Sequence, residues 1–362
     1  MQDMKKFLRI LFFAVNLLFA ILLLLSTLAG VIPPSKCSWI SLLSYVYMPF
    51  LLLNVVCALV WLFFKRWEFL LSIIVIVVRF NMIPLFIQVG GTSTPPVSET
   101  RSRADEFRVM TYNVHQFGGK DYDIEAMSEN ASKFMDIVSN EDPDVICLQE
   151  LMQIRDYSVS DTLEAMGYKY HYSQHTDKNN HPYGVAIFSK NRIGYVGNLD
   201  NDGRKIYADI HKDEFKVRVV CVHMSSYHLN STDHVGLSEL QNREVRASKT
   251  HNLLAKVKDN VIRHEQEWNS DLKEMIEEAK SDMVFVGDFN DTPASYLSRQ
   301  VRKHLKDSFV EEGSGFGITY NGPFPTFRID YIYHSKELKT ISYHRISSDI
   351  SDHSGIVAVF TK

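Results

Sequence analysis

An apolar segment at positions 283–286 is followed at once by acidic and amide side chains, Asp288, Asn290 and Asp291. The segment has the composition of a β-strand, and the Thr-Pro pair after it is typical of the start of a helix. A strand end that presents a carboxylate and an amide together is a common basis for metal-assisted phosphate chemistry. Asp and Asn are also frequent turn residues, so the motif alone is equally compatible with an Asx turn.

Acid, amide or imidazole side chains lie at or near the ends of five more apolar, strand-like segments. These residues are Asn113, Glu150, His223, Asp330 and the pair Asp352–His353. One such residue carries little information, because these types are common in loops. Six separate sites of the same chemical character instead predict a functional site assembled from strand ends.

Hydrolysis of a phosphate ester requires neutralised charge at phosphorus, an activated water and a stabilised leaving oxygen. A hard divalent cation held by carboxylate and amide oxygens meets the first need; Mg²⁺ is the usual ion, with Mn²⁺ as an alternative. Carboxylates and imidazoles provide the proton transfers. The four cysteines lie in apolar segments without metal-type spacing, so neither a zinc site nor a disulfide framework is predicted.

Short strand-like segments alternate with helical ones from position 107 to the end of the chain. Strands are predicted at 107–114, 144–149, 184–188, 206–210, 215–222, 283–286, 329–333, 340–345 and 355–360. Helices are predicted over 124–137, 160–166 (capped by Ser160 or Asp161), 242–280 and onward from a Thr292 cap. This order indicates two packed β-sheets flanked by helices.

The segments that carry these polar residues resemble, in content and order, the motifs of the endonuclease/exonuclease/phosphatase superfamily, the deoxyribonuclease I-like fold. They are Thr111-Tyr-Asn-Val114, Asp144-Val-Ile-Cys-Leu-Gln-Glu150, Tyr183-Gly-Val-Ala-Ile-Phe-Ser-Lys190, Val222-His223, Gly287-Asp-Phe-Asn290, Arg328-Ile-Asp-Tyr-Ile332 and Ser351-Asp-His353. The resemblance covers about three quarters of the chain. It implies a four-layered α/β sandwich, with two packed mixed β-sheets flanked by helices, and metal-dependent phosphoesterase activity.

The resemblance also implies a metal site. Glu150 is expected to bind the ion, with Asn113 close to it and Asp352 near a second metal position. Members of that superfamily differ in how the metal and the acids divide the work, so these roles are expectations for the site as a whole. The remaining histidines, His115 among them, are interpreted as loop or surface residues.

The catalytic roles implied by the resemblance fall on five residues. Asp288 is expected to orient or deprotonate the attacking water, and Asn290 to hold a phosphate oxygen. Asp330 is expected to fix the ring of His353, which contacts the phosphate. His223 is expected to be a second imidazole at the phosphate or the leaving group.

Residues 1–90 are predicted to form a membrane region, with transmembrane helices at 7–32, 42–64 and 69–89. Each stretch reaches the roughly 20 residues that cross a bilayer as a helix. The first is too long for a usual signal-peptide core of about 7–15 residues, and two more stretches follow it. Arg79 interrupts the third stretch, where a charge is costly. Residues 91–105 are predicted to be a linker, and 106–362 the catalytic domain.

Charge is divided unevenly along the chain. Residues 1–97 contain seven basic and two acidic residues, a net charge of +5, and the remaining 32 basic and 41 acidic residues give −9. Basic residues favour the cytoplasmic side, which places Lys5 and Lys6 at the N-terminus, and Lys65 and Arg66 in the second loop, in the cytoplasm. Three crossings then put the catalytic domain outside the cytoplasm; if the third stretch only dips into the membrane, the domain faces the cytoplasm.

The sequence does not choose the phosphate ester. Nucleic-acid binding draws on basic groups, and a net charge of −9 gives no overall basic surface. Membrane attachment suits a phospholipid or an inositol-phosphate-type ester, and equally an external nuclease. The prediction is therefore a membrane-anchored, Mg²⁺-dependent phosphoesterase that acts on nucleic acid, phospholipid or a small phosphoester; the alternative is a catalytically silent relative that acts as a membrane-tethered binding module.

Overall fold

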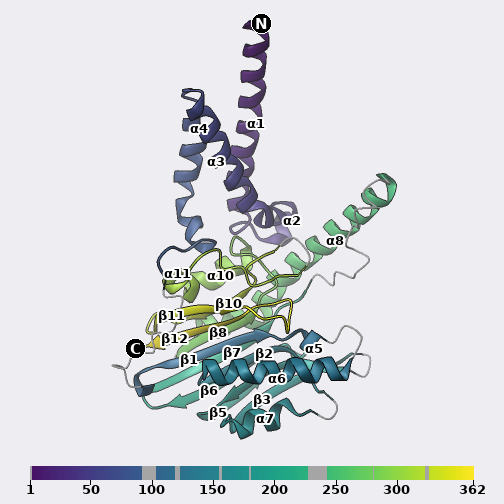
Figure 1. Ribbon diagram of the computed structural model, residues 1–362, viewed down its shortest axis with the longest axis vertical. Helices are drawn as coiled ribbons and strands as arrows, with labels where there is room; N and C mark the ends of the chain where they lie inside the picture. The colour runs from purple at the N-terminus through teal and green to yellow at the C-terminus, as the bar shows by residue number, and fades with distance from the viewer. Residues whose placement is uncertain are drawn as a thin grey trace. The chain divides into compact units, whose positions relative to one another are not determined.

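The computed structural model (Figure 1) describes residues 2–91, 103–118, 123–154, 157–178, 181–226, 243–279, 281–322 and 326–362. Contacts within the chain divide it into two compact units. The sandwich unit comprises Ile87–Ser226, Glu267–Asn290 and Val301–Lys362, and the N-terminal unit comprises Met1–Phe86, Tyr227–Gln266 and Asp291–Gln300. Two segments of the predicted catalytic domain thus belong to the N-terminal unit, and most of the predicted linker lies outside the described residues.

The first sheet of the sandwich unit has six strands in the order β11-β12-β1-β2-β4-β3. They are β1 (Phe107–Asn113), β2 (Val145–Met152), β3 (Tyr170–Lys178), β4 (His181–Ser189), β11 (Lys339–Ile346) and β12 (Gly355–Thr361). β1 pairs in parallel with β2 and antiparallel with β12, so the sheet is mixed.

The second sheet also has six strands, in the order β5-β6-β7-β8-β10-β9. They are β5 (Arg192–Asn198), β6 (Lys205–Lys212), β7 (Phe215–His223), β8 (Asp282–Asp288), β9 (Lys306–Asp307) and β10 (Asp330–His334). β7 and β8 pair in parallel, whereas β8 and β10 pair antiparallel. Each sheet therefore has a parallel pair, and the carboxyl ends of those strands carry polar residues of the predicted site.

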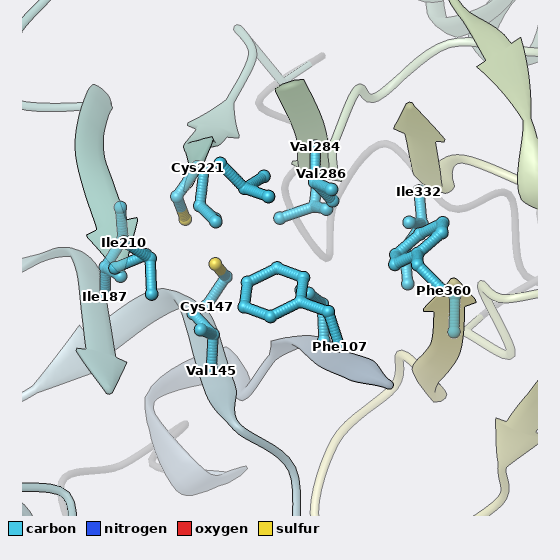
Figure 2. Packing of buried hydrophobic residues seen from close by; sticks show 14 of the residues in the cluster. Phe107, Val145, Cys147, Ile187, Ile210, Cys221, Val284, Val286, Ile332 and Phe360 are labelled. Atoms are coloured by element: carbon cyan, nitrogen blue, oxygen red, sulfur yellow. The ribbon is translucent and has the colours of Figure 1, made fainter. Parts of the chain in front are cut away.

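A continuous apolar core fills the space between the two sheets (Figure 2). Phe107, Val145 and Cys147 of the first sheet face Cys221 and Val284 of the second, and all are fully buried. Because central strands are covered on both faces, their sequences are nearly continuous apolar runs. A second cluster joins the outer face of the first sheet to helix α6 (Ile124–Glu141). The structure confirms the predicted four-layered α/β sandwich.

Further helices lie before or between these strands in the chain. They are η3 (Arg103–Asp105), α5 (His115–Gly118), α6, α7 (Val159–Ala165), α8 (Arg243–Glu267), the π-helical turn η6 (Trp268–Leu272), α9 (Lys273–Glu277), α10 (Tyr296–His304) and α11 (Ser308–Glu312). Two predicted helix starts are wrong. The Ser158 hydroxyl, not that of Ser160, caps α7 by accepting the Asp161 N–H. The helix predicted from Thr292 begins at Tyr296, because residues 292–295 form turns.

The strands that the sequence did not predict, β3, β5 and β9, all lie at sheet edges. An edge strand has one neighbour, and its exposed positions need no regular apolar pattern. β5 contains Gly194 and Gly197, which are unusual inside strands. β9 is only two residues long. The apolar pattern therefore identified the central strands and the edge strand β11, and it failed at the other three edge strands.

The N-terminal unit contains α1 (Gln2–Leu28), α2 (Pro34–Leu42), η1 (Leu43–Val46), α3 (Tyr47–Phe63), α4 (Phe69–Val78) and η2 (Phe80–Leu85). Among the described residues, the helical stretches Gln2–Leu28 and Pro34–Phe63 are long and apolar enough to cross a membrane. The third predicted transmembrane helix, 69–89, is not continuous, because α4 ends at Val78 and a 3-10 helix follows Arg79.

Buried polar side chains join the helices of the N-terminal unit. Asn16 of α1 donates through Nδ2 to the Ser72 hydroxyl of α4 over 2.7 Å. Its Oδ1 accepts the Trp61 indole N–H of α3 over 2.9 Å. Such hydrogen bonds connect helices whose other surfaces are apolar, as in transmembrane bundles.

Candidate active site

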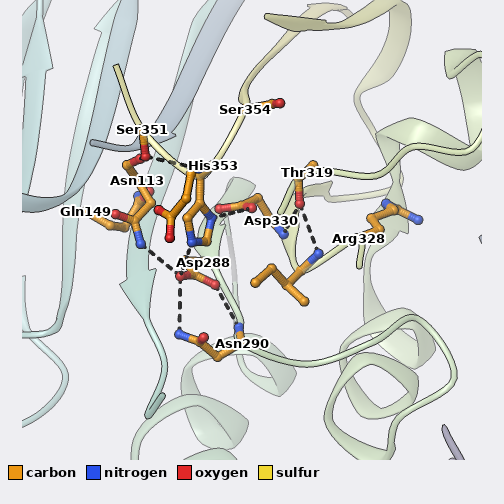
Figure 3. Close-up of polar contacts among 12 residues, drawn as sticks. Asn113, Gln149, Asp288, Asn290, Thr319, Arg328, Asp330, Ser351, His353 and Ser354 are labelled. Carbon is orange, nitrogen blue, oxygen red and sulfur yellow. Dashed lines mark hydrogen bonds and ion pairs between the residues drawn. The ribbon is translucent and has the colours of Figure 1, made fainter. Parts of the chain in front are cut away.

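The two sheets bring the polar strand ends into one hydrogen-bonded cluster (Figure 3). Asp288, at the end of β8, is the register partner of His223 on β7 and of Asp330 on β10. Asn113 ends β1 in the other sheet, and its Nδ2 donates to Asp288 Oδ2 over 2.9 Å. The end of β1 in one sheet and the end of β8 in the other therefore bring together residues that are 175 positions apart.

Asp288 is the centre of the hydrogen-bond network. Its Oδ1 accepts the backbone N–H of Asn290 over 2.8 Å, and its Oδ2 accepts the Asn290 side-chain amide over 3.2 Å. The same amide nitrogen donates to the Met224 carbonyl over 3.2 Å. The Asn113 amide also lies 3.4 Å from Glu150 Oε1. Amide donors thus fix the carboxylates of Asp288 and Glu150 from two sides.

Backbone strain marks two of the predicted site residues. Glu150 has φ of 52° and Asn290 has φ of 48°, both in the left-handed region that non-glycine residues seldom adopt. The register of β2 against β4 shifts between Leu148 and Leu151, which places a bulge at Glu150. Bulges beside sites re-aim a side chain, and strained backbone is found where function requires it. Both features direct the Glu150 and Asn290 side chains toward the cluster.

His353 and Asp330 form a buried acid–imidazole pair. His353 Nδ1 lies 2.9 Å from Asp330 Oδ2, which leaves Nε2 directed at Asp288, 3.8 Å from its Oδ2. The backbone N–H of Asp330 donates to the Thr319 hydroxyl over 3.0 Å. The backbone N–H of His353 donates to the Ser351 hydroxyl, which in turn donates to the Asn113 carbonyl. The loop before β12 is therefore connected to the end of β1, and the loop before β10 to the start of β10.

Within the part of the chain that the structure describes, one buried imidazole nitrogen of His223 has no hydrogen-bond partner. Its Nε2 lies 3.6 Å from Glu150 Oε1 and 3.8 Å from Asp288 Oδ2, too far for a hydrogen bond to either. A buried polar atom without a partner costs free energy, so such an atom in a native structure calls for an explanation. A ligand oxygen between these three side chains would satisfy it.

His115, which the sequence placed among the loop residues, lies at the edge of this site. Its Nδ1 is 2.5 Å from Asp352 Oδ1, and its backbone N–H donates to the Asn113 side chain over 3.0 Å. Asp352 is therefore paired with an imidazole. The hydrogen bond that Asp352 accepts from the His115 ring raises the pKa of His115. Burial alone would raise the pKa of Asp352, but the hydrogen bond and charge of His115 lower it.

The acids and imidazoles of the cluster have shifted pKa values. Burial raises the pKa of Asp288 to about 6, although the charges of His353 and His223 oppose this shift. Burial alone would lower the pKa of His353, but the charges of Asp330 and Asp288 raise it to about 10. A carboxyl group with a pKa near neutrality is suited to general base catalysis, and a persistent imidazolium is suited to an anionic ligand.

The donor set fits a divalent metal ion. Asp288, Asp330 and His353 have potential ligand atoms within 4.8 Å of one another and are all buried. His353 Nδ1 is already bound to Asp330, so the oxygen-rich side of the cluster, with Glu150 and Asn113, is the better candidate for a hard cation. His223 Nε2, which has no hydrogen-bond partner among the described residues, lies beside Glu150 and Asp288 in the same region.

The structure brings seven of the eight predicted site residues into a connected cluster, and joins the eighth, Asp352, to it through His115. The residues that hold the site residues in place, His115, Gln149 and Thr319, were not predicted from the sequence. Gln149 is fully buried, and its amide nitrogen lies 3.0 Å from the Thr111 hydroxyl and 3.2 Å from the Cys221 sulfur. Its position directly before Glu150 was the only available sign of this role.

Fold and site together define a two-sheet α/β sandwich protein whose strand ends carry acid, amide and imidazole groups. The chain belongs to the endonuclease/exonuclease/phosphatase family, whose model matches residues 110–353. Members of this family are generally phosphoesterase hydrolases and generally depend on divalent metals. A separate model, described as a domain of unknown function, matches residues 8–86.

Solved structures resemble the chain at low sequence identity. An endonuclease/exonuclease/phosphatase from Beutenbergia cavernae is 18% identical, with a TM-score of 0.47 over 71% of this chain and 72% of that chain. Truncated TDP2 from Caenorhabditis elegans is 20% identical, with a TM-score of 0.46 over 71% and 98%. The human Nocturnin catalytic domain with bound sulfate is 19% identical, with a TM-score of 0.47 over 75% and 99%. Among curated protein sequences, none matches.

Proposed function

We propose that this protein is a membrane-anchored, divalent-metal-dependent phosphoesterase that hydrolyses its substrate by attack of water. The observation that carries the proposal is the cluster in which Asn113 and Glu150 of one sheet meet Asp288 of the other. These side chains are separated by long stretches of sequence, and an α/β sandwich needs no such polar cluster for stability. A cluster of acids, amides and imidazoles between two apolar sheets is what phosphate ester hydrolysis requires.

Asp288 is the residue best placed to orient and deprotonate water. Its carboxylate is buried, and amide groups of Asn113 and Asn290 hold both oxygens in fixed positions. Burial raises its pKa to about 6, so the carboxylate accepts a proton readily while remaining largely ionised at neutral pH. The Asn290 amide beside it provides an uncharged donor for a phosphate oxygen.

His353 and His223 supply the imidazoles. Asp330 holds His353 through Nδ1, which keeps the ring oriented and charged with Nε2 facing Asp288. In this role His353 contacts a phosphate oxygen. His223 approaches from β7 on the side of Glu150, and its partnerless Nε2 is free to bind the phosphate or the leaving oxygen.

Glu150 and Asn113 would hold the metal ion, with Asp352 near a second position. When bound, a divalent cation supplies positive charge that stabilises the phosphate oxygens. Mg²⁺ is proposed because the donors are carboxylate and amide oxygens, and Mn²⁺ is the alternative. The bulge at Glu150 and the hydrogen bond from Asn113 orient these donors in advance.

Membrane attachment is proposed through the apolar helices of the N-terminal unit. The segment after the first of them contacts residues that the family model includes: the Ser35 N–H and hydroxyl both donate to Glu265, over 2.6 and 2.9 Å. This contact supports a catalytic domain on the same side as the first loop. With Lys5 and Lys6 in the cytoplasm, that side is extracytoplasmic.

The proposed substrate is a phosphate ester, either nucleic acid or a phospholipid or small phosphoester. The experiment is hydrolysis by the full-length protein in detergent, with Mg²⁺, against plasmid DNA, oligonucleotides, phospholipid vesicles and inositol phosphates. We expect hydrolysis of one substrate class and its loss when a chelator is added. We also expect the rate of hydrolysis to fall at least about a hundredfold in Asn290→Ala and in His353→Ala. His211→Ala, at an exposed histidine on β6, serves as the control.

The alternative function gives a different outcome in the same experiment. A binding module would show no hydrolysis with any substrate class, while the folded protein would still bind one of them. Activity that survives both substitutions would contradict the assignment of the site.

A further inference from the structure

The residue after Asn290 is a buried acid held by two other parts of the N-terminal unit. Asp291 is 2% exposed. Its Oδ1 accepts the Tyr45 hydroxyl over 3.0 Å, and its Oδ2 lies 3.2 Å from His264 Nδ1. A carboxylate is an acceptor, so His264 presents Nδ1–H to it. Tyr45 lies in the 3-10 helix η1, inside the second long apolar stretch and before α3, whereas His264 lies on α8.

Further contacts within the N-terminal unit hold the same turn. The Thr292 backbone N–H donates to Asp291 Oδ1 over 2.9 Å, and its hydroxyl donates to the Ser44 carbonyl over 3.4 Å. Ala294 is buried against Leu23 of α1 and Leu51 of α3. The turn that follows the Gly-Asp-Phe-Asn motif is therefore built against the segment that joins α1 to α3.

One peptide bond connects this turn to a strained residue of the candidate site. Asn290 has φ of 48°, a conformation that costs free energy and persists only when both flanking segments are fixed. On its N-terminal side, Asp288 Oδ1 holds the Asn290 N–H. On its C-terminal side, the next residue is Asp291, whose carboxylate is fixed by Tyr45 and His264.

We propose that Tyr45 and His264 are positioning residues, which act through Asp291 to keep Asn290 in its left-handed conformation. The η1 helix that precedes α3 then contributes to hydrolysis as well as to the proposed membrane anchor. The inference rests on the proposed function, because Asn290 is the residue through which the effect reaches the substrate. A shift of about 1 Å in such a residue lowers turnover by roughly a hundredfold without loss of binding.

The test uses the full-length protein in nanodiscs. Tyr45→Phe removes one hydroxyl and is expected to lower kcat about tenfold or more, with KM changed by less than about twofold. Tyr195→Phe, at an exposed tyrosine on β5, is the matched control and should turn over as the wild type does. His264→Leu should resemble Tyr45→Phe, whereas His264→Asn, whose amide nitrogen takes the place of Nδ1, should retain most of the activity.

Two further measurements separate this inference from its alternatives. If Tyr45 acts through Asp291, then adding Tyr45→Phe to Asp291→Ala should change kcat no further. Hydrogen exchange should also be faster at 286–292 in Tyr45→Phe than in the wild type, which can be measured without turnover. The inference would be overturned if Tyr45→Phe had the kcat and the hydrogen exchange of the wild type. It would also be overturned if the effects of Tyr45→Phe and Asp291→Ala on kcat were fully additive. If the wild type hydrolysed no substrate, that result would count against the proposed function. The exchange measurement would still test whether Tyr45 holds the turn at Asn290.

Discussion

At the scale of single residues, the environment of each acid in the site determines its chemistry. Asp288 is buried among amide donors and has a pKa of about 6, whereas Asp330 is paired with His353 and keeps that ring charged. The proposed roles, Asp288 as base and Asp330 as orienting group, follow from this difference between their neighbours. The family resemblance implied these two roles, but the neighbours that produce the two environments could not be predicted from the sequence.

The pairing of Asp330 with His353 leads to a prediction about pH dependence. His353 has a pKa raised to about 10, so its contribution to stability is fully present below about pH 6.5 and is lost as pH rises through 10. If the charged ring contacts the phosphate, kcat/KM falls over the same alkaline range.

Asp330→Asn removes the largest charge that raises this pKa, so the alkaline fall of kcat/KM should move to lower pH, by about one to three pH units. The measurement is the pH profile of kcat/KM for the variant and for Asp161→Asn, an exposed acid used as control. An alkaline limb at the same pH in both variants would show that Asp330 does not set the charge of His353.

The types and order of the site residues could be predicted, but the residues that hold them in place could not. Asn113, Glu150 and Asp288 stood out because each ends or follows an apolar run. His115 and Thr319 gave no such sign, since a histidine and a threonine in loops are ordinary. Their roles depend on partners, Asp352 for one and the backbone N–H of Asp330 for the other, that only the folded chain brings near.

At the scale of elements, the predictions succeeded where burial on both faces imposes a pattern. Strands β1, β2, β7 and β8 are apolar almost throughout, and all were predicted. The edge strands β3, β5 and β9 were missed because one of their sides is free. The bulge in β2 could not be predicted either, although it orients the Glu150 side chain toward the site.

Helix starts were predicted less well than strands, for a local reason. A Ser, Thr or Asp before an apolar run offers several cap positions within a few residues. For α7 the hydroxyl of Ser158 takes that place. For α10 the helix starts after Ser295, whose hydroxyl accepts the Ser298 N–H, because Asp291 and Thr292 are engaged in the preceding turn.

At the scale of the whole molecule, the predicted domain boundaries and the compact units differ. The sequence divides at the linker after position 90, whereas Tyr227–Gln266 and Asp291–Gln300 belong to the N-terminal unit. Composition identifies apolar helices but carries no information on which distant segments pack with them. The hydrogen bonds of Ser35 with Glu265 and of Tyr45 with Asp291 could therefore not be predicted.

These contacts lead to a prediction about membrane topology. Ser35 in the first loop and Tyr45 near the start of the second predicted span each bond to a residue more than 200 positions later, so the C-terminal domain should lie on the side of the first loop. A reporter fused after Lys362 should behave as extracytoplasmic, and one placed at the N-terminus as cytoplasmic. A cytoplasmic signal at both ends would mean that the chain crosses the membrane twice and that the third apolar stretch does not span it.

The central claim is that Glu150 helps to hold a divalent ion on which phosphate ester hydrolysis depends. Its most direct test is an Mg²⁺ titration of hydrolysis by the full-length wild type, by Glu150→Gln and by Glu164→Gln, an exposed control on α7. The account predicts that Glu150→Gln raises the half-saturating Mg²⁺ concentration at least about tenfold while its melting temperature stays close to that of the wild type. Identical titrations for all three proteins, or full activity in chelator, would contradict it.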